Sequence, residues 1–245
     1  MMKVLINGIN GKMGKQVANL VLENKSMHLL GGLDYKEIQN LPYPIFTDIN
    51  SIFEKPDVII DFSIPESSIN LLPFCIKNKI PIVIATTGFS SEQSNKIQEV
   101  SKEIPIFQSS NMSFEIGLMN TIITQIVKEL PNSEIEIIET HHNKKLDSPS
   151  GTALMLADTI NRTNSNSYTY NFTRQQKREK RNPKEIGFSS IRGGGIIGEH
   201  TVLFFNEDET LEIKHTAYSR KIYAEGALKA AEFIVTKCFG YYNTL

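Results

Sequence analysis

Strand-like and helix-like segments alternate over the first 112 residues of this 245-residue chain. Helical patterns separate most of the strand-like runs, which lie at 3–7, 27–33, 57–63, 81–88 and 104–107. Parallel strands need such crossovers, because a tight turn reverses the direction of the chain. The alternation therefore predicts an α/β fold with a doubly wound parallel sheet, that is, a Rossmann-like domain.

A glycine-rich loop joins the first predicted strand to the first predicted helix, which covers 15–22. Gly8, Gly11 and Gly14 would allow a tight turn and a close approach of the backbone to a pyrophosphate, which the helix start then stabilises. The spacing predicts a dinucleotide site. It is G-x-x-G-x-x-G rather than G-x-G-x-x-G, so an ordinary strand-to-helix turn is the alternative.

Asp34 follows the second predicted strand, at about the 20-residue separation from the loop that a ribose-binding acid requires. Its carboxylate could accept hydrogen bonds from the adenosine ribose hydroxyls. Tyr35 comes next, and no adjacent arginine is available for a 2′-phosphate, which favours NADH over NADPH, although Lys36 could still serve NADPH. Thr86 to Gly88 end another strand and would let a nicotinamide ring approach the backbone.

The alternation stops after about residue 112, where a second domain is predicted to begin. Its pattern favours a mixed or antiparallel sheet with helices on one face: helices 116–130 and 151–161, strands 134–139 and 186–191, and a hairpin over 201–215. An amphipathic helix at 224–239 is expected to pack back on the first domain. The predicted domains are therefore 1–112 with 218–245, and 113–217.

The most informative stretch runs from Glu139 to Ala153 and reads E-T-H-H-N-K-K-L-D-S-P-S-G-T-A. Ser150 is a natural N-cap, and the backbone N–H groups of Gly151 and Thr152 would fall in the first helical turn, where they can bind a carboxylate. Two histidines and two lysines precede them. The stretch predicts a site for an acidic substrate that receives a proton. The alternative is a polar, solvated turn with incidental histidines.

The composition gives little reason to expect a macromolecular partner. The formal net charge of −1 does not indicate nucleic acid or a membrane surface. The charge run 174–181 could bind a phosphate-rich partner, but a solvated loop or exposed helix is favoured because no aromatic residues interleave. Two cysteines make a disulfide framework improbable, and we expect a cytoplasmic protein with no metal site.

The stretch from Glu139 to Ala153 resembles the E-x-H-H-x-x-K-x-D-x-P-S-G-T-A motif of the 4-hydroxy-tetrahydrodipicolinate reductase (dihydrodipicolinate reductase) family. The resemblance covers essentially the whole chain. Supporting matches lie at 8–14, 85–89, 110–113, 192–193 with 198–201, and 219–220 with 224–227.

The resemblance implies reduction of 4-hydroxy-2,3,4,5-tetrahydrodipicolinate, a small cyclic dicarboxylate, by NADH or NADPH in diaminopimelate and lysine biosynthesis. His141 or Lys145 would supply the proton, and His142, Gly151 and Thr152 would bind substrate. The second domain would bind substrate and build a homotetramer. The implied cofactor-binding residues are Gly8, Ile9, Asn10, Gly11, Lys12, Met13, Asp34, Ala85, Thr86, Thr87, Ser109, Ser110, Asn111 and Met112.

Three positions depart from the family pattern. Asp34-Tyr35 replaces the Glu-Arg pair of some members, which leaves the cofactor preference open, while Ala85 replaces a frequent Gly and Met112 a frequent Phe. None of these removes a proton-transfer group. The alternative functions are another nicotinamide-dependent reductase or dehydrogenase of small amino or keto acids, and a non-catalytic dinucleotide-sensing protein. Neither needs the His-His-x-x-Lys and Ser-Gly-Thr groups together.

Overall fold

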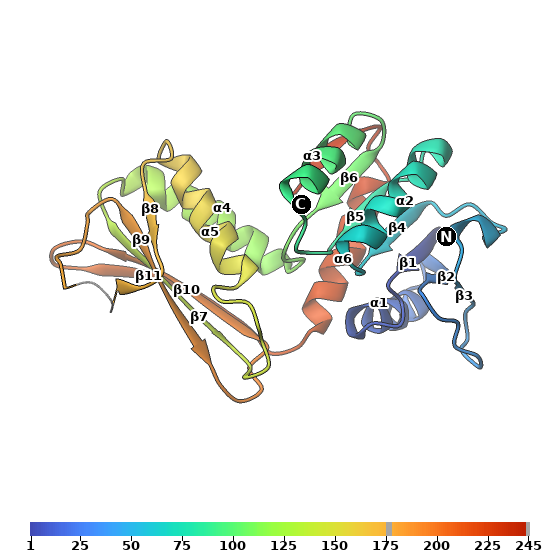
Figure 1. Cartoon of the computed structure of the whole chain (residues 1–245), viewed down its shortest axis with the longest axis horizontal. Helices are drawn as coiled ribbons and strands as arrows, with labels where there is room; N and C mark the ends of the chain where they lie inside the picture. Colours follow the sequence, from blue (N-terminus) through green and yellow to red (C-terminus); the bar gives the residue numbers. More distant parts are fainter. Residues whose placement is uncertain (175–177, 244–245) are drawn as a thin grey trace. The chain divides into compact units, whose positions relative to one another are not determined.

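The computed structural model describes residues 1–174 and 178–243 (Figure 1). The chain divides into two compact units, Met1–Phe114 with Arg220–Leu245, and Glu115–Ser219. Each boundary lies two residues beyond the position predicted from the sequence. In the described residues, no helix has the length and apolar character needed to cross a membrane.

A seven-stranded parallel sheet forms the first unit, in the order β12-β6-β5-β4-β1-β2-β3. Its strands are β1 (Met2–Asn7), β2 (Met27–Leu33), β3 (Ile45–Phe46), β4 (Val58–Asp61), β5 (Ile82–Ile84), β6 (Pro105–Gln108) and β12 (Gly240–Tyr242). Its helices are α1 (Lys12–Glu23), α2 (Pro65–Asn78), α3 (Ser91–Val100), α6 (Lys221–Ile234) and the short 3₁₀ helix η1 (Ile49–Ser51).

Both faces of this sheet are covered by helices. Val4 and Ile6 belong to a core with α1 and α6, whereas Leu5 belongs to a core with α2 and α3. Because neighbouring side chains of a strand point to opposite faces, a strand covered on both sides must be apolar throughout. This explains the continuous apolar runs and confirms the predicted doubly wound sheet.

A five-stranded mixed sheet forms the second unit, in the order β11-β10-β7-β9-β8. β10 runs antiparallel to β7 and β11, while β9 runs parallel to β7 and β8. These strands are β7 (Glu134–His141), β8 (Thr169–Asn171), β9 (Glu185–Arg192), β10 (Gly198–Phe205) and β11 (Thr210–Ala217), and the helices are α4 (Phe114–Glu129) and α5 (Gly151–Thr163).

The two helices pack on one face of this mixed sheet. Ile135 and Ile137 of β7 and Val202 and Phe204 of β10 alternate along their strands and form a core with α4 and α5. The predicted mixed sheet with helices on one face is therefore confirmed (Figure 1).

The differences from the predicted elements lie mainly at sheet edges. The last helix ends at Ile234 instead of residue 239, because Gly240–Tyr242 turns back to pair with β6 as β12. The strands β3, β8 and β12 were not predicted. Each is two or three residues long and lies at an edge of its sheet, so backbone pairing forms it without a periodic apolar pattern.

Helix α6 approaches the backbone of the first unit closely at Gly226. A Cβ atom there would lie 1.6 Å from the carbonyl oxygen of Met112, so any larger residue would force the helix away. Gly117 in α4 is the contrasting case, because no atom lies within 4 Å of the position of its missing Cβ.

We therefore predict that Gly226→Ala lowers the free energy of unfolding by about 1–3 kcal/mol, the usual cost of overpacking. Gly117→Ala is the matched control and should be neutral or stabilising by up to about 1 kcal/mol, because alanine favours a helix over glycine. Denaturant unfolding of both variants checks this. Equal midpoints for the two variants would contradict the close approach at Gly226.

Candidate active site

The carboxyl ends of neighbouring strands bring the predicted cofactor residues to one edge of the first sheet. Ser109 to Met112 follow β6, Ala85 to Thr87 follow β5, Gly8 to Met13 follow β1, and Asp34 follows β2. Between β4 and β1 the strand order reverses, which is where doubly wound proteins bind ligands. The fold therefore gathers four separate segments into one place.

The glycine loop is shaped by two close backbone approaches. Gly8 has a φ of +78°, and a Cβ on it would lie 2.6 Å from the carbonyl oxygen of Phe62. A Cβ on Gly14 would lie 2.2 Å from the carbonyl oxygen of Gly8. Helix α1 begins at Lys12, three residues before its predicted start, so Lys12 and Met13 lie in its first turn. The loop thus has the tight form that suits a pyrophosphate.

A cavity of about 760 Å³ adjoins this loop and contains Gly8, Asn10, Gly11 and Asp34 in its lining. Asp34 is held in place because Oδ2 accepts a hydrogen bond from the backbone N–H of Asn10 at 2.8 Å, and Oδ1 accepts one from that of Tyr35 at 2.9 Å. Each carboxylate oxygen retains capacity to accept a ribose hydroxyl. The glycine loop and this carboxylate fit the adenosine end of NADH or NADPH.

The cavity carries negative charge. Asp48 and Glu66 line it together with Asp34, and no lysine or arginine belongs to its lining in the described part of the chain.

Ile9 is one predicted cofactor residue whose side chain points into the core. It is 1% exposed, so its side chain cannot reach a cofactor.

A buried acid, Asp61, connects the strand ends beneath this edge. Its Oδ1 accepts hydrogen bonds from Asn7 Nδ2 at 2.9 Å and from Ser63 Oγ at 2.6 Å, and the Ser63 N–H donates to Thr86 Oγ1 at 3.1 Å. Burial raises the pKa of Asp61, although the hydrogen bonds from Ser63 and Ser68 oppose this. The network links the ends of β1, β4 and β5.

The remaining predicted cofactor residues form a turn after β6. Ser109 Oγ donates to the carbonyl oxygen of Asn111 at 2.7 Å, and Asn111 Oδ1 accepts from the Ser113 N–H at 2.9 Å. Met112 is buried, whereas Ser110 is exposed. Thr87, after β5, is also exposed, and Ala85 is half-buried.

In the second unit, β7 runs two residues beyond its predicted end and includes His141. Helix α5 begins at Gly151, as predicted. Ser150 caps it, because its Oγ accepts a hydrogen bond from the Ala153 N–H at 3.2 Å. Open space lies where a side chain of Gly151 would be, whereas Thr152 is buried. The helix start therefore has the form of the predicted anion site.

Asp147 lies near both predicted proton donors, Lys145 and His141. Lys145 Nζ is 2.8 Å from Asp147 Oδ1. Partial burial acts to raise the pKa of Asp147, but the hydrogen bond from Lys145 and the nearby charges of Lys145 and His141 lower it overall. His142 is half-buried, and its N–H donates to the carbonyl oxygen of Ile196 at 2.7 Å. The structure thus connects His141 to the helix start through Glu139, and Lys145 follows His142 in a turn closed by the hydrogen bond from the Lys145 N–H to the His142 carbonyl oxygen at 3.1 Å.

Glu139 and Arg192 were not assigned a role from the sequence, yet they lie at the centre of this group. Glu139 is 1% exposed and contacts His141 Nδ1 through Oε2. Arg192 donates to both carboxylate oxygens, at 2.8 Å and 2.6 Å. Burial alone would raise the pKa of Glu139, but the hydrogen bonds from His141 and Arg192 lower it to about 2. The two-residue spacing of Glu139 and His141, which puts both on one strand face, could have indicated the pair.

His200 is a second residue that sequence reasoning missed. It is 2% exposed, its ring packs edge-to-face on that of His141 with centroids 5.1 Å apart, and its Nε2 lies 2.8 Å from Ser150 Oγ. Burial, followed by the nearby charge of His141, lowers the pKa of His200 to about 3. A neutral His200 therefore supports the cap of α5 at physiological pH.

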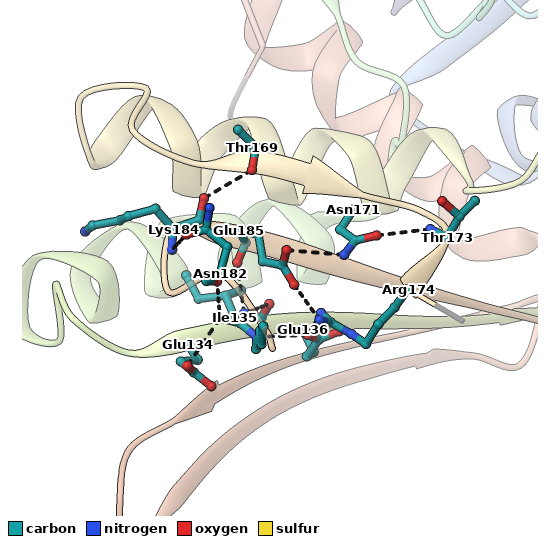
Figure 2. Close-up of polar contacts among 11 residues, drawn as sticks. Glu134, Ile135, Glu136, Thr169, Asn171, Thr173, Arg174, Asn182, Lys184 and Glu185 are labelled. Carbon is teal, nitrogen blue, oxygen red and sulfur yellow. Dashed lines mark hydrogen bonds and ion pairs between the residues drawn. The ribbon is translucent and has the colours of Figure 1, made fainter. Parts of the chain in front are cut away.

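The charge run at 174–181 is not simply solvated. Arg174 Nη2 lies 2.7 Å from Glu136 Oε1, and its Nη1 lies 2.5 Å from Glu185 Oε1 (Figure 2). Arg181 also pairs with Glu136, at 3.3 Å. These ion pairs join the segment to the sheet, which corrects the favoured prediction of a solvated loop for its two ends. Residues 175–177 of the run lie outside the described residues.

The doubly wound parallel sheet with its glycine loop and strand-end acid is typical of dinucleotide-dependent oxidoreductases. Residues 2–112 match the family described as dihydrodipicolinate reductase, N-terminus, and residues 116–244 match the corresponding C-terminus. The chain belongs to the dihydrodipicolinate reductase family. It is therefore an NAD(P)H-dependent 4-hydroxy-tetrahydrodipicolinate reductase of diaminopimelate and lysine biosynthesis.

Individual relatives agree with this assignment. The chain is 46% identical over 243 residues to the 4-hydroxy-tetrahydrodipicolinate reductase of Caldanaerobacter subterraneus, covering 99% of this chain and 96% of that protein. It is 45% identical over 246 residues to the enzyme of Clostridium tetani, covering 99% and 95%. A dipicolinate-bound dihydrodipicolinate reductase from Paenisporosarcina sp. TG-14 has a TM-score of 0.82 at 27% identity, covering 99% of this chain and 98% of that one.

We predict that His200 makes the protein less stable as the pH falls from about 6.5 towards 3. In this range the unfolded chain binds a proton that folded His200 does not, so stability changes by up to about 1.4 kcal/mol per pH unit. In His200→Gln, the slope of the unfolding free energy against pH between 6.5 and 4.5 should be smaller. The difference corresponds to uptake of up to one proton fewer on unfolding, or up to about 1.4 kcal/mol per pH unit. Burial also lowers the pKa of His215. Because the wild type and the variant both contain His215, its effect cancels when their slopes are compared. Identical slopes would contradict a buried, neutral His200.

Proposed function

We propose that His141 or Lys145 delivers the proton in this reduction, while His142, Lys145 and the start of α5 bind the substrate. The observation that carries this proposal is the convergence of His141, Lys145 and the capped helix start in one short stretch. NADH or NADPH, when bound, supplies the hydride. The protein must then bind an anion and deliver a proton to the reduced ring, and this stretch contains groups for both tasks.

The substrate class is supported by charge. A cyclic dicarboxylate needs cations or backbone N–H groups for its carboxylates, and Lys145 and the first turn of α5 offer both. The Paenisporosarcina relative was solved with dipicolinate, which is itself a cyclic dicarboxylate. Lys145 is half-buried and its present partner, Asp147, is exposed, so exchanging that partner for a substrate carboxylate costs little.

We propose that the predicted residues at the carboxyl edge of the first sheet bind the cofactor, and that NADH is preferred. Asp34, Asp48 and Glu66 line the cavity beside the glycine loop, so a 2′-phosphate would meet carboxylates there. Lys36 is exposed and could offset part of this repulsion. The first unit is then the dinucleotide-binding domain and the second the substrate-binding domain.

We also propose that the second domain joins subunits into a homotetramer. Its helices cover one face of the sheet, whereas Ile138, Leu203 and Phe205 alternate with the core residues and point to the other face, where each is half-buried. An apolar strip on a sheet face suits contact with another copy. Light scattering of the purified protein tests this, since four chains of 27.6 kDa would scatter as one particle.

A coupled assay tests the function and the cofactor preference together. The substrate is generated in place from pyruvate and aspartate semialdehyde by its synthase, and oxidation of NADH and of NADPH is followed separately. We expect synthase-dependent oxidation, with kcat/KM for NADH higher by about tenfold or more, which corresponds to about 1.4 kcal/mol. An equal or higher value for NADPH would refute the cofactor proposal. No oxidation although both cofactors bind would instead favour a dinucleotide-sensing protein.

Lys145→Ala should lower kcat by about 10²-fold and raise KM for the substrate, because one side chain is proposed to hold a carboxylate and assist proton transfer. Binding of NADH, followed by fluorescence, should be unchanged. Lys214→Ala is the matched control, since Lys214 is also ion-paired with a carboxylate in the same unit, at 2.9 Å from Glu199. Unchanged steady-state kinetics in Lys145→Ala would remove Lys145 from the mechanism.

A further inference from the structure

We infer that Glu139 is a positioning residue that fixes the tautomer and the orientation of His141, and this inference rests on the proposed proton-donor role of His141. Glu139 projects from β7 two residues before His141, so both side chains lie on the same face of the sheet. On that face they follow the core residues Ile135 and Ile137, at the end where the apolar core gives way to polar groups.

Two partners from other segments fix Glu139 in place. Arg192 of β9 holds both carboxylate oxygens, and the backbone N–H of Ser150 donates to Oε1 at 3.3 Å. Arg192 is itself fixed, because Nη2 donates to the carbonyl oxygen of Asp147 at 2.8 Å. Bidentate contact with a guanidinium leaves a carboxylate little freedom to rotate. The oxygen that faces His141 therefore has a defined position.

The pairing also explains why a buried acid is tolerated here. An ionised carboxylate that is 1% exposed is costly to bury unless it is paired and hydrogen-bonded. Arg192 neutralises the charge and Ser150 adds a hydrogen bond, so Glu139 stays ionised. An ionised carboxylate can only accept, so its contact with His141 requires a proton on Nδ1.

This requirement determines which ring nitrogen performs the chemistry. With the Nδ1 proton held by Glu139, the transferable proton of protonated His141 is the one on Nε2. In the transfer step the Nε2–H bond breaks, its electron pair remains on Nε2, and the proton bonds to the substrate atom that carries the negative charge. Neutral His141 then keeps its Nδ1 proton and regains the Nε2 proton from water.

The same carboxylate links proton transfer to anion binding. Ser150, whose N–H binds Glu139, is also the N-cap of α5, and its Oγ contacts His200. The ring of His200 packs on that of His141 from β10. His141 is thus held directly by Glu139 of β7 and His200 of β10, which in turn contact Arg192 of β9 and Ser150 at the start of α5.

The first test reads the tautomer in the unliganded protein. With ¹⁵N-labelled histidine and assignment through His141→Asn, neutral His141 should show a protonated Nδ1 and an unprotonated Nε2. A free neutral imidazole carries its proton mainly on Nε2, and His141 should move towards that state in Glu139→Leu. A wild-type His141 with the proton on Nε2 would overturn the inference. This measurement needs no substrate, so it stands apart from the proposed function.

The second test is kinetic and has a matched control on the same strand. Glu139→Gln removes the charge at His141 and should lower kcat by about tenfold or more, while leaving the KM for NADH within about twofold. Glu136→Gln makes the same change three residues earlier in β7, on the opposite face of the sheet, where Arg174 (Figure 2) and Arg181 hold the carboxylate. It should leave kcat within about twofold.

Equal kinetics for both variants, with thermal unfolding confirming that both are folded, would contradict the positioning role. A wild-type protein that binds NADH but lacks reductase activity would refute the proposed function and not the tautomer.

Discussion

A buried carboxylate, that of Glu139, holds together the segments of the second unit on which its chemistry depends. It contacts His141 on β7, Arg192 at the end of β9 and Ser150 at the start of α5. One carboxylate thereby serves as a hydrogen-bond acceptor for all three groups. His141, the proposed proton donor, and the start of α5, the proposed anion site, therefore share a structural partner in Glu139.

The first unit uses a similar arrangement. Asp61 at the end of β4 is fully buried and receives hydrogen bonds from Asn7 on β1 and from Ser63 and Ser68 after its own strand. In both units an acid at or near the carboxyl end of a strand fixes the loops that follow neighbouring strands. Loops carry the groups that bind ligands, and rigid support below them keeps those groups in position.

Sequence patterns could predict the elements and contacts that are local. The doubly wound sheet follows from apolar runs such as Val4 to Ile6, and the start of α5 follows from Ser150 and Gly151. Arg192 and His200 could not be assigned in this way, since they reach Glu139 and His141 only through pairing of strands about 50 residues apart in the chain.

The charge run shows the same limit. From the sequence, Arg174 and Arg181 are predicted to be solvated. In the structure both pair with Glu136, because Gly187, the residue opposite it on β9, leaves room for the carboxylate. A Cβ on Gly187 would lie 2.0 Å from Glu136 Oε2. Local propensity contains no information on which strand residues face each other, so ion pairs across a sheet become visible only with the register.

We propose that one stretch of the second unit binds a carboxylate of the substrate and supplies the proton. A crystal structure of the protein with NADH and dipicolinate tests it most directly. We expect one dipicolinate carboxylate to lie on the N–H groups of the first turn of α5 and on Lys145 Nζ, with Nε2 of His141 facing the ring. Dipicolinate bound with both carboxylates beyond hydrogen-bond reach of these groups, more than about 3.2 Å away, would contradict it.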